Sequence, residues 1–316
     1  MLMLAPMAGL TDAAFRLLVK DYGCDWVFSE MVSAKGIVYH NPSTERLLRM
    51  EDSERPLSVQ IFGSDPEAMA AAAQHIADVY GPDAIDINMG CPTPKIVRNG
   101  DGAALLRNPE KAAAVASAVV KSIRLPVSVK IRTGWDSQSI NCVEVARRLE
   151  DAGVHAVTVH GRTREQFYSG KADWRWIAAV AAAVNIDVVG NGDVFSPEDA
   201  CSMLAVTGCQ HIMVGRGTMG NPWLFRDIKA VLAGRTVPPP PSLAERRSVA
   251  LRHLRRKTDL VGERLAVVQM RGHLGSYLKG VPHAAESRQK MTQCTSYEEV
   301  EQVFLDLESE LSRSCS

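Results

Sequence analysis

A single cysteine occupies a position in this sequence where a thiol can do chemistry. Cys91 lies between Gly90 and Pro92, directly after the apolar run of residues 84–88. A thiol in a loop at the end of a strand can act as a nucleophile or as a general acid. The other cysteines are scattered, and a free cysteine is more often a small core residue; they are Cys24, Cys142, Cys201, Cys209, Cys294 and Cys315. We therefore predict that Cys91 is the catalytic residue.

Two glycine-rich segments have the composition of an anion-binding site. They are residues 191–193 (Asn-Gly-Asp) and residues 215–217 (Gly-Arg-Gly). Glycines let backbone N–H groups approach a phosphate closely, a following helix N-terminus adds a favourable dipole, and Arg216 adds a full charge. The alternative is that these glycines only form tight turns. The pattern favours a phosphate site, and it suits the phosphate of FMN.

Lys130 and Gln60 also end apolar runs and carry groups that a flavin could use. Lys130 closes the run Val-Ser-Val-Lys, and its charge at a flavin's pyrimidine edge would stabilise the reduced ring. Gln60 could form a hydrogen bond with the same edge. The alternative for Lys130 is a lysine at a strand end whose charge reaches solvent.

These residues need a scaffold that gathers strand ends, and the sequence has a suitable period. Eight short apolar runs start at 1, 26, 57, 84, 127, 156, 187 and 211, so seven gaps span 210 residues and average 30. Helices are predicted in the gaps over residues 66–80, 111–123, 141–152 and 196–206. This alternation predicts a (β/α)8 TIM barrel, whose active site lies at the C-terminal strand ends. An open doubly wound sheet is the alternative, but no GxGxxG follows the first run.

The pattern changes after residue 236. Four consecutive prolines, residues 238–241, cannot continue a helix, and no strand pattern follows them. Helices are predicted over residues 243–261, 265–278, 284–291 and 296–311. We therefore predict a barrel domain over residues 1–236, a proline-rich linker over 237–241 and a small all-α domain over 242–316.

The composition is that of a globular protein. Hydrophobic residues make up 46% and charged residues 23%, which excludes disordered and collagen-like chains. Scattered cysteines without a CxxC pair indicate a reducing compartment and no zinc site. The first residues lack the basic start of a signal peptide, and no apolar run is long enough to span a membrane. We expect a cytoplasmic protein with no metal and no membrane partner.

The ordered set of motifs resembles one family, the bacterial tRNA-dihydrouridine synthases of the B-like branch. The longest matching string is DINMGCP at residues 86–92, continued by GAALL at 102–106. The others are APMAG (5–9) with TD (11–12), SEM (29–31), Gln60 with Gly63, KIRTGW (130–135), HGRT (160–163), NGD (191–193) and GRG (215–217). The resemblance covers the whole barrel in order and is weaker in the helical tail.

The resemblance implies an FMN enzyme that uses NADPH, or NADH, to reduce uridines of the tRNA D-loop to dihydrouridine. Hydride would pass from flavin N5 to uracil C6, and Cys91 would give a proton to C5. The residues implied to contact the substrate are Asn88, Arg132, Arg162 and Arg271. The residues implied to hold FMN are Pro6, Met7, Ala8, Gln60, Lys130, His160, Asn191, Gly192, Asp193, Gly215 and Arg216. In the tail, Gly272 stands where the family commonly has a lysine.

The distribution of charge favours an RNA partner although the whole chain is neutral. Lys+Arg and Asp+Glu are both 36. Residues 246–290 carry eleven basic and three acidic side chains, a net of +8, whereas residues 291–316 carry a net of −5. Helical spacing places Arg252, Arg255 and Arg256 on one face with Lys257 beside them, which predicts a tRNA-binding surface. The alternative is a solvated helix face.

Two other functions would use part of the same pattern. A small-molecule FMN oxidoreductase of the dihydroorotate dehydrogenase type would use the flavin residues but has no need of a basic helical domain. A non-catalytic RNA-binding or chaperone protein would not need Cys91 beside them. We expect a monomer that binds tRNA and not DNA.

Overall fold

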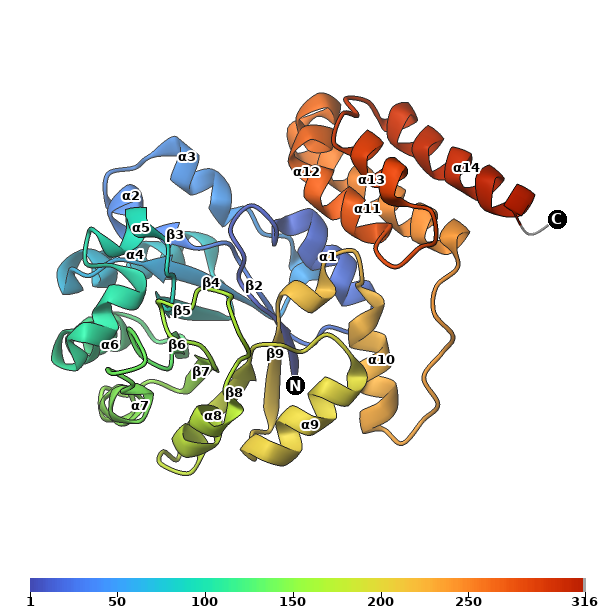
Figure 1. Ribbon diagram of the computed structural model, residues 1–316. Coiled ribbons are helices and arrows are strands. Elements are labelled where there is room, and N and C mark those ends of the chain that lie inside the picture. The colour runs from blue at the N-terminus through green and yellow to red at the C-terminus, as the bar shows by residue number, and fades with distance from the viewer. Residues whose placement is uncertain (315–316) are drawn as a thin grey trace.

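The computed structural model describes residues 1–314 and shows a ring of parallel strands surrounded by helices, with a further group of helices at the C-terminal end (Figure 1). The strands are β1 (Leu2–Leu4), β2 (Val27–Phe28), β3 (Val32–Ser33), β4 (Leu57–Phe62), β5 (Ala84–Met89), β6 (Val127–Arg132), β7 (Ala156–His160), β8 (Asp187–Asn191) and β9 (His211–Val214).

The strands form a nearly closed barrel. Within residues 1–314, eight parallel strands follow the order β1-β9-β8-β7-β6-β5-β4-β2, and an isolated bridge between Met3 and Trp26 joins the two ends. This is a TIM barrel, and the predicted fold is confirmed. The short strand β3 was not predicted. It continues the edge formed by β2, because β2 pairs with the first residues of β4 and β3 with the last.

Helices alternate with the strands and cover the outside of the barrel (Figure 1). They are α1 (Ala13–Asp21), α2 (Ala34–Val38), α3 (Pro42–Glu45), α4 (Pro66–Tyr80), α5 (Pro94–Val97), α6 (Pro109–Ser122), α7 (Cys142–Asp151), α8 (Trp174–Ala181), α9 (Pro197–Thr207) and α10 (Trp223–Leu232). Helix α4 illustrates why the predicted bounds hold. The Asp65 side chain accepts the Ala68 N–H at the start, and Gly81 ends the helix at φ +53°.

The two faces of each strand have different surroundings. Leu2, Leu4 and Ile212 point outward into a large apolar core shared with the helices. Their neighbours Met3 and Met213 belong to a small apolar cluster. Because successive strand residues point to opposite faces, this cluster lies inside the barrel.

Four helices follow the barrel: α11 (Leu243–Val261), α12 (Glu263–Tyr277), α13 (Ala285–Met291) and α14 (Tyr297–Ser314). An extended connection without helix or strand, residues 235–242, joins α10 to α11. The N-cap Ser242 starts α11 by accepting the Glu245 N–H. Among residues 1–314, no helix combines the length and hydropathy needed to cross a membrane.

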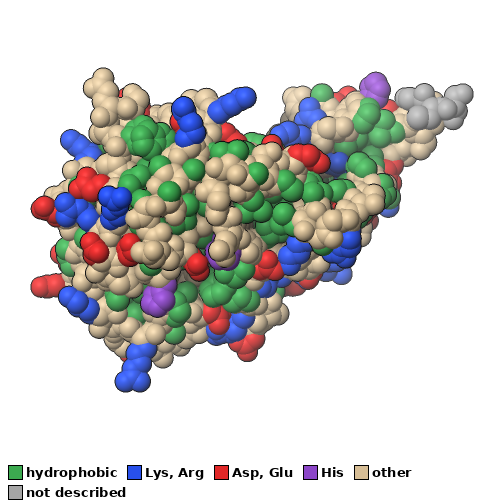
Figure 2. All heavy atoms as spheres, turned by 90° about the horizontal axis from the view of Figure 1, so that it is seen from below, with side chains coloured by type: hydrophobic (Ala, Val, Ile, Leu, Met, Phe, Trp, Pro, Cys, Tyr) green, Lys and Arg blue, Asp and Glu red, His purple; other side chains and the backbone are tan. Residues whose placement is uncertain are grey.

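The basic face of α11 is directed differently from the sequence prediction. Arg252 and Arg256 both pair with Asp21 of α1, at 3.9 and 3.0 Å, and Lys257 pairs with Asp12 at 2.7 Å. Opposite charges on the barrel therefore attract this face inward. Arg252, Arg256 and Lys257 thus pair with the barrel, whereas Arg255 lies over Tyr297, so the four side chains do not form one unpaired face. Binding of tRNA by this face stays a prediction. Figure 2 likewise shows basic and acidic side chains intermingled on the face that it draws.

A second contact connects the C-terminal helices to the loop after β1. His273 Nε2 lies 3.1 Å from the carbonyl oxygen of Leu10, and Phe15 packs against His273 and His253. Burial lowers the pKa of both histidines, so both are neutral at neutral pH. A neutral His273 can donate one N–H to Leu10, which fixes the loop against α12.

Replacement of Gly272 by alanine should stabilise the protein. Gly272 lies inside α12, is exposed, and has no atom within 4 Å of the place a Cβ would take. Because glycine costs a helix interior about 0.5–1 kcal/mol relative to alanine, Gly272→Ala should raise the free energy of unfolding by that amount. Urea denaturation measures it. Gly262→Ala is the control and should destabilise, because Gly262 has φ +82°. Equal effects of the two substitutions would contradict this prediction.

Candidate active site

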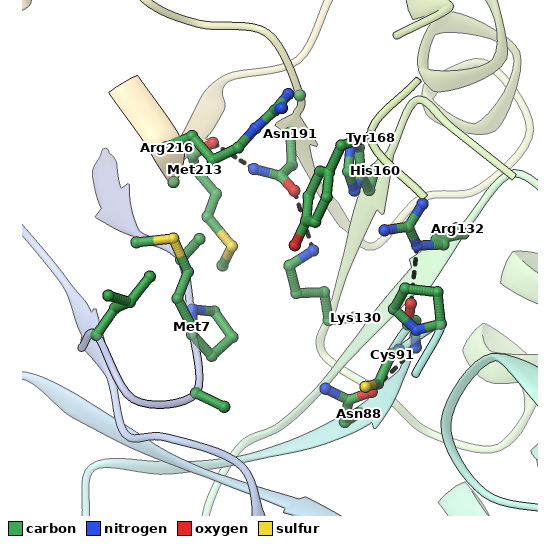
Figure 3. Close-up of a pocket in the computed structure, with 18 of the residues that line it drawn as sticks. Met7, Asn88, Cys91, Lys130, Arg132, His160, Tyr168, Asn191, Met213 and Arg216 are labelled. Atoms are coloured by element: carbon green, nitrogen blue, oxygen red, sulfur yellow. Dashed lines mark hydrogen bonds between the residues drawn. The ribbon is translucent and has the colours of Figure 1, made fainter. Parts of the chain in front are cut away.

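A pocket of about 450 Å³ opens at the C-terminal ends of the barrel strands (Figure 3). Its walls come from the loops after β1, β5, β7, β8 and β9 and from residues within β4–β9. It is lined by Cys91, Asn88, Arg132 and all eleven residues that the sequence assigned to a flavin site: Pro6, Met7, Ala8, Gln60, Lys130, His160, Asn191, Gly192, Asp193, Gly215 and Arg216. The fold thus brings together residues that are up to 210 positions apart in the sequence, as barrel closure requires.

The loop that carries Cys91 is held by hydrogen bonds with two side chains, Asn88 and Arg132. Asn88 Oδ1 accepts the backbone N–H groups of Gly90 at 3.2 Å and Cys91 at 2.9 Å. Arg132 Nε donates to the Gly90 carbonyl at 2.8 Å. The Cys91 thiol itself is half-buried and donates to Thr93 Oγ1 at 3.3 Å. The loop therefore presents the thiol to the pocket in a fixed place.

Lys130 places a cation in the floor of the pocket. Its Nζ donates to Asn191 Oδ1 at 3.0 Å, and Asn191 Nδ2 in turn donates to the Met213 carbonyl at 2.7 Å. Burial, with Arg132 nearby, lowers the pKa of Lys130 to about 8. Burial and the same cations keep the pKa of His160 well below its usual value, so His160 is neutral. The floor combines one ammonium group with a neutral imidazole.

Asp193 connects the two glycine-rich loops. Its carboxylate accepts two hydrogen bonds from Arg162, at 2.8 and 2.7 Å, and one from Arg216 at 2.9 Å. It also accepts the Ala172 N–H at 2.7 Å. The pKa of Asp193 is lowered: its partial burial raises it, but hydrogen bonds from Arg162 and Ala172 and the arginine charges outweigh that. Asp193 therefore braces the loops and is saturated with donors.

The glycine loops pack closely against neighbouring backbone and leave no room for a side chain. A Cβ on Gly217 would lie 2.2 Å from the Val194 carbonyl oxygen, and Gly192 has φ +117°. The loop after β9 turns directly into the single 3-10 turn η4 (Arg216–Thr218). The predicted helix N-terminus is thus only one turn here, whereas α9 supplies a full helix after β8.

Two of the predicted substrate residues lie elsewhere. Arg162 is buried and does not line the pocket, because its guanidinium is taken up by Asp193 and the carbonyls of Ser169 and Gly170. A substrate contact for Arg162 stays a prediction, which its position outside the pocket lining does not support. Arg271 lies in α12 and donates to the Cys294 carbonyl at 2.9 Å, so it ties α12 to the segment before α14.

The sequence did not single out Tyr168, which lies at the mouth of the pocket. Its ring lies 4.6 Å from the Arg216 guanidinium and 5.8 Å from that of Arg132, and it remains 51% exposed. Figure 3 shows the ring directed into the cavity between these arginines. The only signal in the sequence was its place in the loop after β7, since a lone tyrosine has no informative spacing. It supplies an aromatic surface beside two cations.

Asp86 is fully buried below the pocket, and its charge is costly. Burial raises its pKa from 3.8 to about 6. An acid with a raised pKa keeps its full contribution to stability below pH 3.8 and loses stability as the pH rises toward 6. The free energy of unfolding of Asp86→Asn should therefore exceed that of the natural chain by about 3 kcal/mol at pH 7. This difference should disappear as the pH falls to about 4. Urea denaturation across this range measures it; a constant gap would contradict the prediction.

Comparison with known proteins agrees with this geometry. The chain matches the family model described as dihydrouridine synthase (Dus) over residues 3–312. It is 41% identical over 309 residues to tRNA-dihydrouridine synthase B of Shewanella oneidensis, covering 97% of this chain and 96% of the relative. It is 42% identical over 288 residues to tRNA-dihydrouridine synthase B of Pseudomonas aeruginosa, covering 91% and 86%. With Probable tRNA-dihydrouridine synthase 1 of Synechocystis it shares 41% identity over 296 residues, covering 93% and 82%. The chain therefore belongs to the dihydrouridine synthase family.

Proposed function

We propose that this protein is an FMN-dependent tRNA-dihydrouridine synthase that uses NADPH, or NADH, to reduce the C5–C6 double bond of uridines in the tRNA D-loop. One observation carries the proposal: the thiol of Cys91 faces the same pocket as Lys130 and the two glycine-rich loops. A thiol beside a flavin-type site is what a proton-coupled hydride transfer to a pyrimidine ring requires.

The residues of the pocket fit FMN. The loops at 191–193 and 215–217 offer backbone N–H groups, and Arg216 adds a charge for a phosphate. Lys130 would face the ring system, where a cation stabilises negative charge. When bound, FMN would supply the hydride that reduces the substrate. The neighbouring residues proposed to hold it are Pro6, Met7, Ala8, Gln60, His160, Asn191, Gly192, Asp193 and Gly215.

The protein's own residues would position the uracil and move one proton. Cys91 would deliver the proton from Sγ to C5 of the ring, and Thr93 Oγ1 accepts the thiol hydrogen until then. Asn88 and Arg132 hold the Gly90–Cys91 peptide group next to the thiol. Tyr168 at the mouth offers a surface against which an unstacked base could rest, as a base leaving its helix needs.

The tRNA would bind over the pocket mouth and part of the C-terminal helices. Residues 246–290 keep a net charge of +8, but Arg252, Arg256 and Lys257 are already paired with barrel carboxylates. Arg255 instead stacks over Tyr297 at 5.4 Å. The basic residues outside the docked face, together with Arg216 at the mouth, are therefore the proposed phosphate contacts.

NADPH oxidation with different acceptors tests the proposal. The purified protein, saturated with FMN, is mixed with NADPH and either unmodified tRNA, free uridine or orotate. Consumption that depends on tRNA, together with tRNA binding that weakens as salt rises, is expected. Consumption with orotate and none with tRNA would favour a small-molecule oxidoreductase instead. Protein that binds tRNA but neither FMN nor NADPH would indicate a non-catalytic RNA-binding protein.

A further inference from the structure

We propose that Asp86 is a positioning residue that fixes the hydrogen-bond direction of Gln60 and Asn88 and thereby holds the backbone of Cys91. Its importance for uridine reduction rests on the proposed function, whereas the hydrogen-bond chain itself is a property of the pocket floor. The chain runs from a carboxylate inside the barrel to the catalytic loop through two side-chain amides.

The first link starts at a group that can only accept. Asp86 lies on β5 with none of its surface exposed. Its Oδ2 accepts from Gln60 Nε2 at 2.6 Å, and its Oδ1 accepts from Ser128 Oγ at 2.5 Å. An ionised carboxylate has no hydrogen to donate. Burial raises the pKa of Asp86 to about 6 and Lys130 acts in the opposite direction, so the carboxyl group is ionised at about pH 8. Asp86 therefore obliges Gln60 to turn its NH2 group toward β5.

The remaining links follow from that orientation. With its NH2 group toward Asp86, Gln60 turns Oε1 toward Asn88 and accepts from Asn88 Nδ2 at 2.8 Å. Asn88 then turns Oδ1 toward the loop and accepts the N–H groups of Gly90 and Cys91. Backbone N–H groups can only donate. An acceptor at one end and donors at the other therefore permit a single direction for both amides.

Sheet register explains why these side chains meet. Gln60 on β4 is the direct neighbour of Asp86 on β5, and Asp86 is the direct neighbour of Ser128 on β6. Asn88 follows Asp86 by two residues, so both point to the barrel interior. The inward-pointing residues of β4, β5 and β6 therefore make this side of the interior polar. Gln60 and Asn88 are both less than 10% exposed, so their amide groups are largely shielded from water.

A reversal of the chain tests the proposal. Asn88→Asp alone puts carboxylates at both ends of Gln60, which can satisfy only one of them with its NH2 group. Asp86→Asn combined with Asn88→Asp moves the charge by two residues. The amide introduced at position 86 can then donate to a reversed Gln60. Gln60 in turn donates to the carboxylate introduced at position 88, which still accepts from the loop. Net charge is the same in this double variant as in the natural chain.

The measurement is the rate at which iodoacetamide alkylates Cys91 at pH 8 in the purified full chain, followed by peptide mass spectrometry. Asn88→Asp should accelerate alkylation roughly tenfold, because Gln60 stays turned toward Asp86 and no longer fixes the orientation of the side chain at position 88 that holds the loop, and the double variant should return to within about threefold of the natural chain. Thr158→Val is the control for a substitution in the same buried interior, since Thr158 on β7 is the direct strand neighbour of Lys130 on β6. It should leave the rate unchanged.

A double variant that reacts as fast as Asn88→Asp, or that fails to fold as Asn88→Asp does, would overturn the proposal. If Asn88→Asp alone does not fold but the double variant does, that result would support the proposal. The assay involves neither tRNA nor NADPH. The double variant could return to the slow alkylation rate of the natural chain while the natural chain itself reduces no tRNA. That pair of results would refute the proposed function and leave this inference standing.

Discussion

Replacement of Cys91 by alanine is expected to lower the rate of dihydrouridine formation by about 10²–10⁴-fold, the usual contribution of a general acid. The side chain carries the thiol at the pocket wall, and no other cysteine lines the pocket among residues 1–314. FMN binding should persist, because the proposed flavin contacts come from other strands. The measurement is the initial rate of dihydrouridine formation in tRNA, with flavin content determined on the same sample.

Cys201→Ala is the matched control for this experiment. Cys201 is also a partly exposed free cysteine, but it lies on α9 away from the pocket lining. Its loss should leave the rate unchanged within a factor of about two, since surface substitutions cost little. Cys91→Ala protein that keeps the full rate would contradict the assignment of Cys91 as the proton donor. A slow variant that has also lost FMN would show that Cys91 acts on the cofactor site.

Replacement of Arg162 by methionine is expected to destabilise the protein by about 3 kcal/mol and to weaken FMN binding. Arg162 is 2% exposed and forms a two-pronged ion pair with Asp193. Its removal leaves a partly buried carboxylate without its main partner, and breaking such pairs is costly. Asp193 also accepts a hydrogen bond from Arg216, so both glycine-rich loops should become less well fixed. We expect FMN affinity to fall roughly tenfold, equivalent to about 1.4 kcal/mol.

Urea denaturation and the quenching of FMN fluorescence measure the two effects. Arg175→Met is the matched control, because Arg175 forms an ion pair with Asp173 in the same region but is 87% exposed. Exposed ion pairs contribute about 0–1 kcal/mol to the free energy of unfolding. The hydrogen bonds of Arg175 go to Asp173 and not to the glycine-rich loops. Equal destabilisation by the two substitutions would contradict the bracing role of Arg162. If Arg162→Met lowers stability but leaves FMN affinity unchanged, the ion pair with Asp193 does not support the cofactor site.

Most of the barrel could be predicted from the sequence because its signals are local. Each of the longer strands coincides with an apolar run in the sequence. Many of the longer helices begin at a capping side chain or a proline, as α4 does at Asp65 and Pro66. The residues at strand ends could be gathered into one site without any contact information, since a parallel barrel brings all those ends to one face. The shared position of Cys91 and Lys130 at the pocket was predicted in this way.

The remaining features depend on partners far away in the sequence. The basic face of α11 looked like a surface for RNA, but Asp12 and Asp21, at the start and end of α1, neutralise part of it across more than 230 residues. Arg162 has the residue type of a substrate contact, and its ion pair with Asp193 becomes visible only in the structure. Periodicity indicates which face a side chain occupies but not which atom it bonds, so neither pairing could be predicted.

Mass spectrometry of tRNA tests the central claim most directly. Unmodified tRNA is incubated with the FMN-saturated protein and NADPH, digested, and compared with the same tRNA incubated with Cys91→Ala protein. We predict a gain of about two mass units, a hydride and a proton, on uridine-containing fragments of the D-loop with the natural chain, and a greatly reduced gain with the variant. Unchanged tRNA after incubation with the FMN-loaded natural chain, or a gain confined to fragments outside the D-loop, would contradict it.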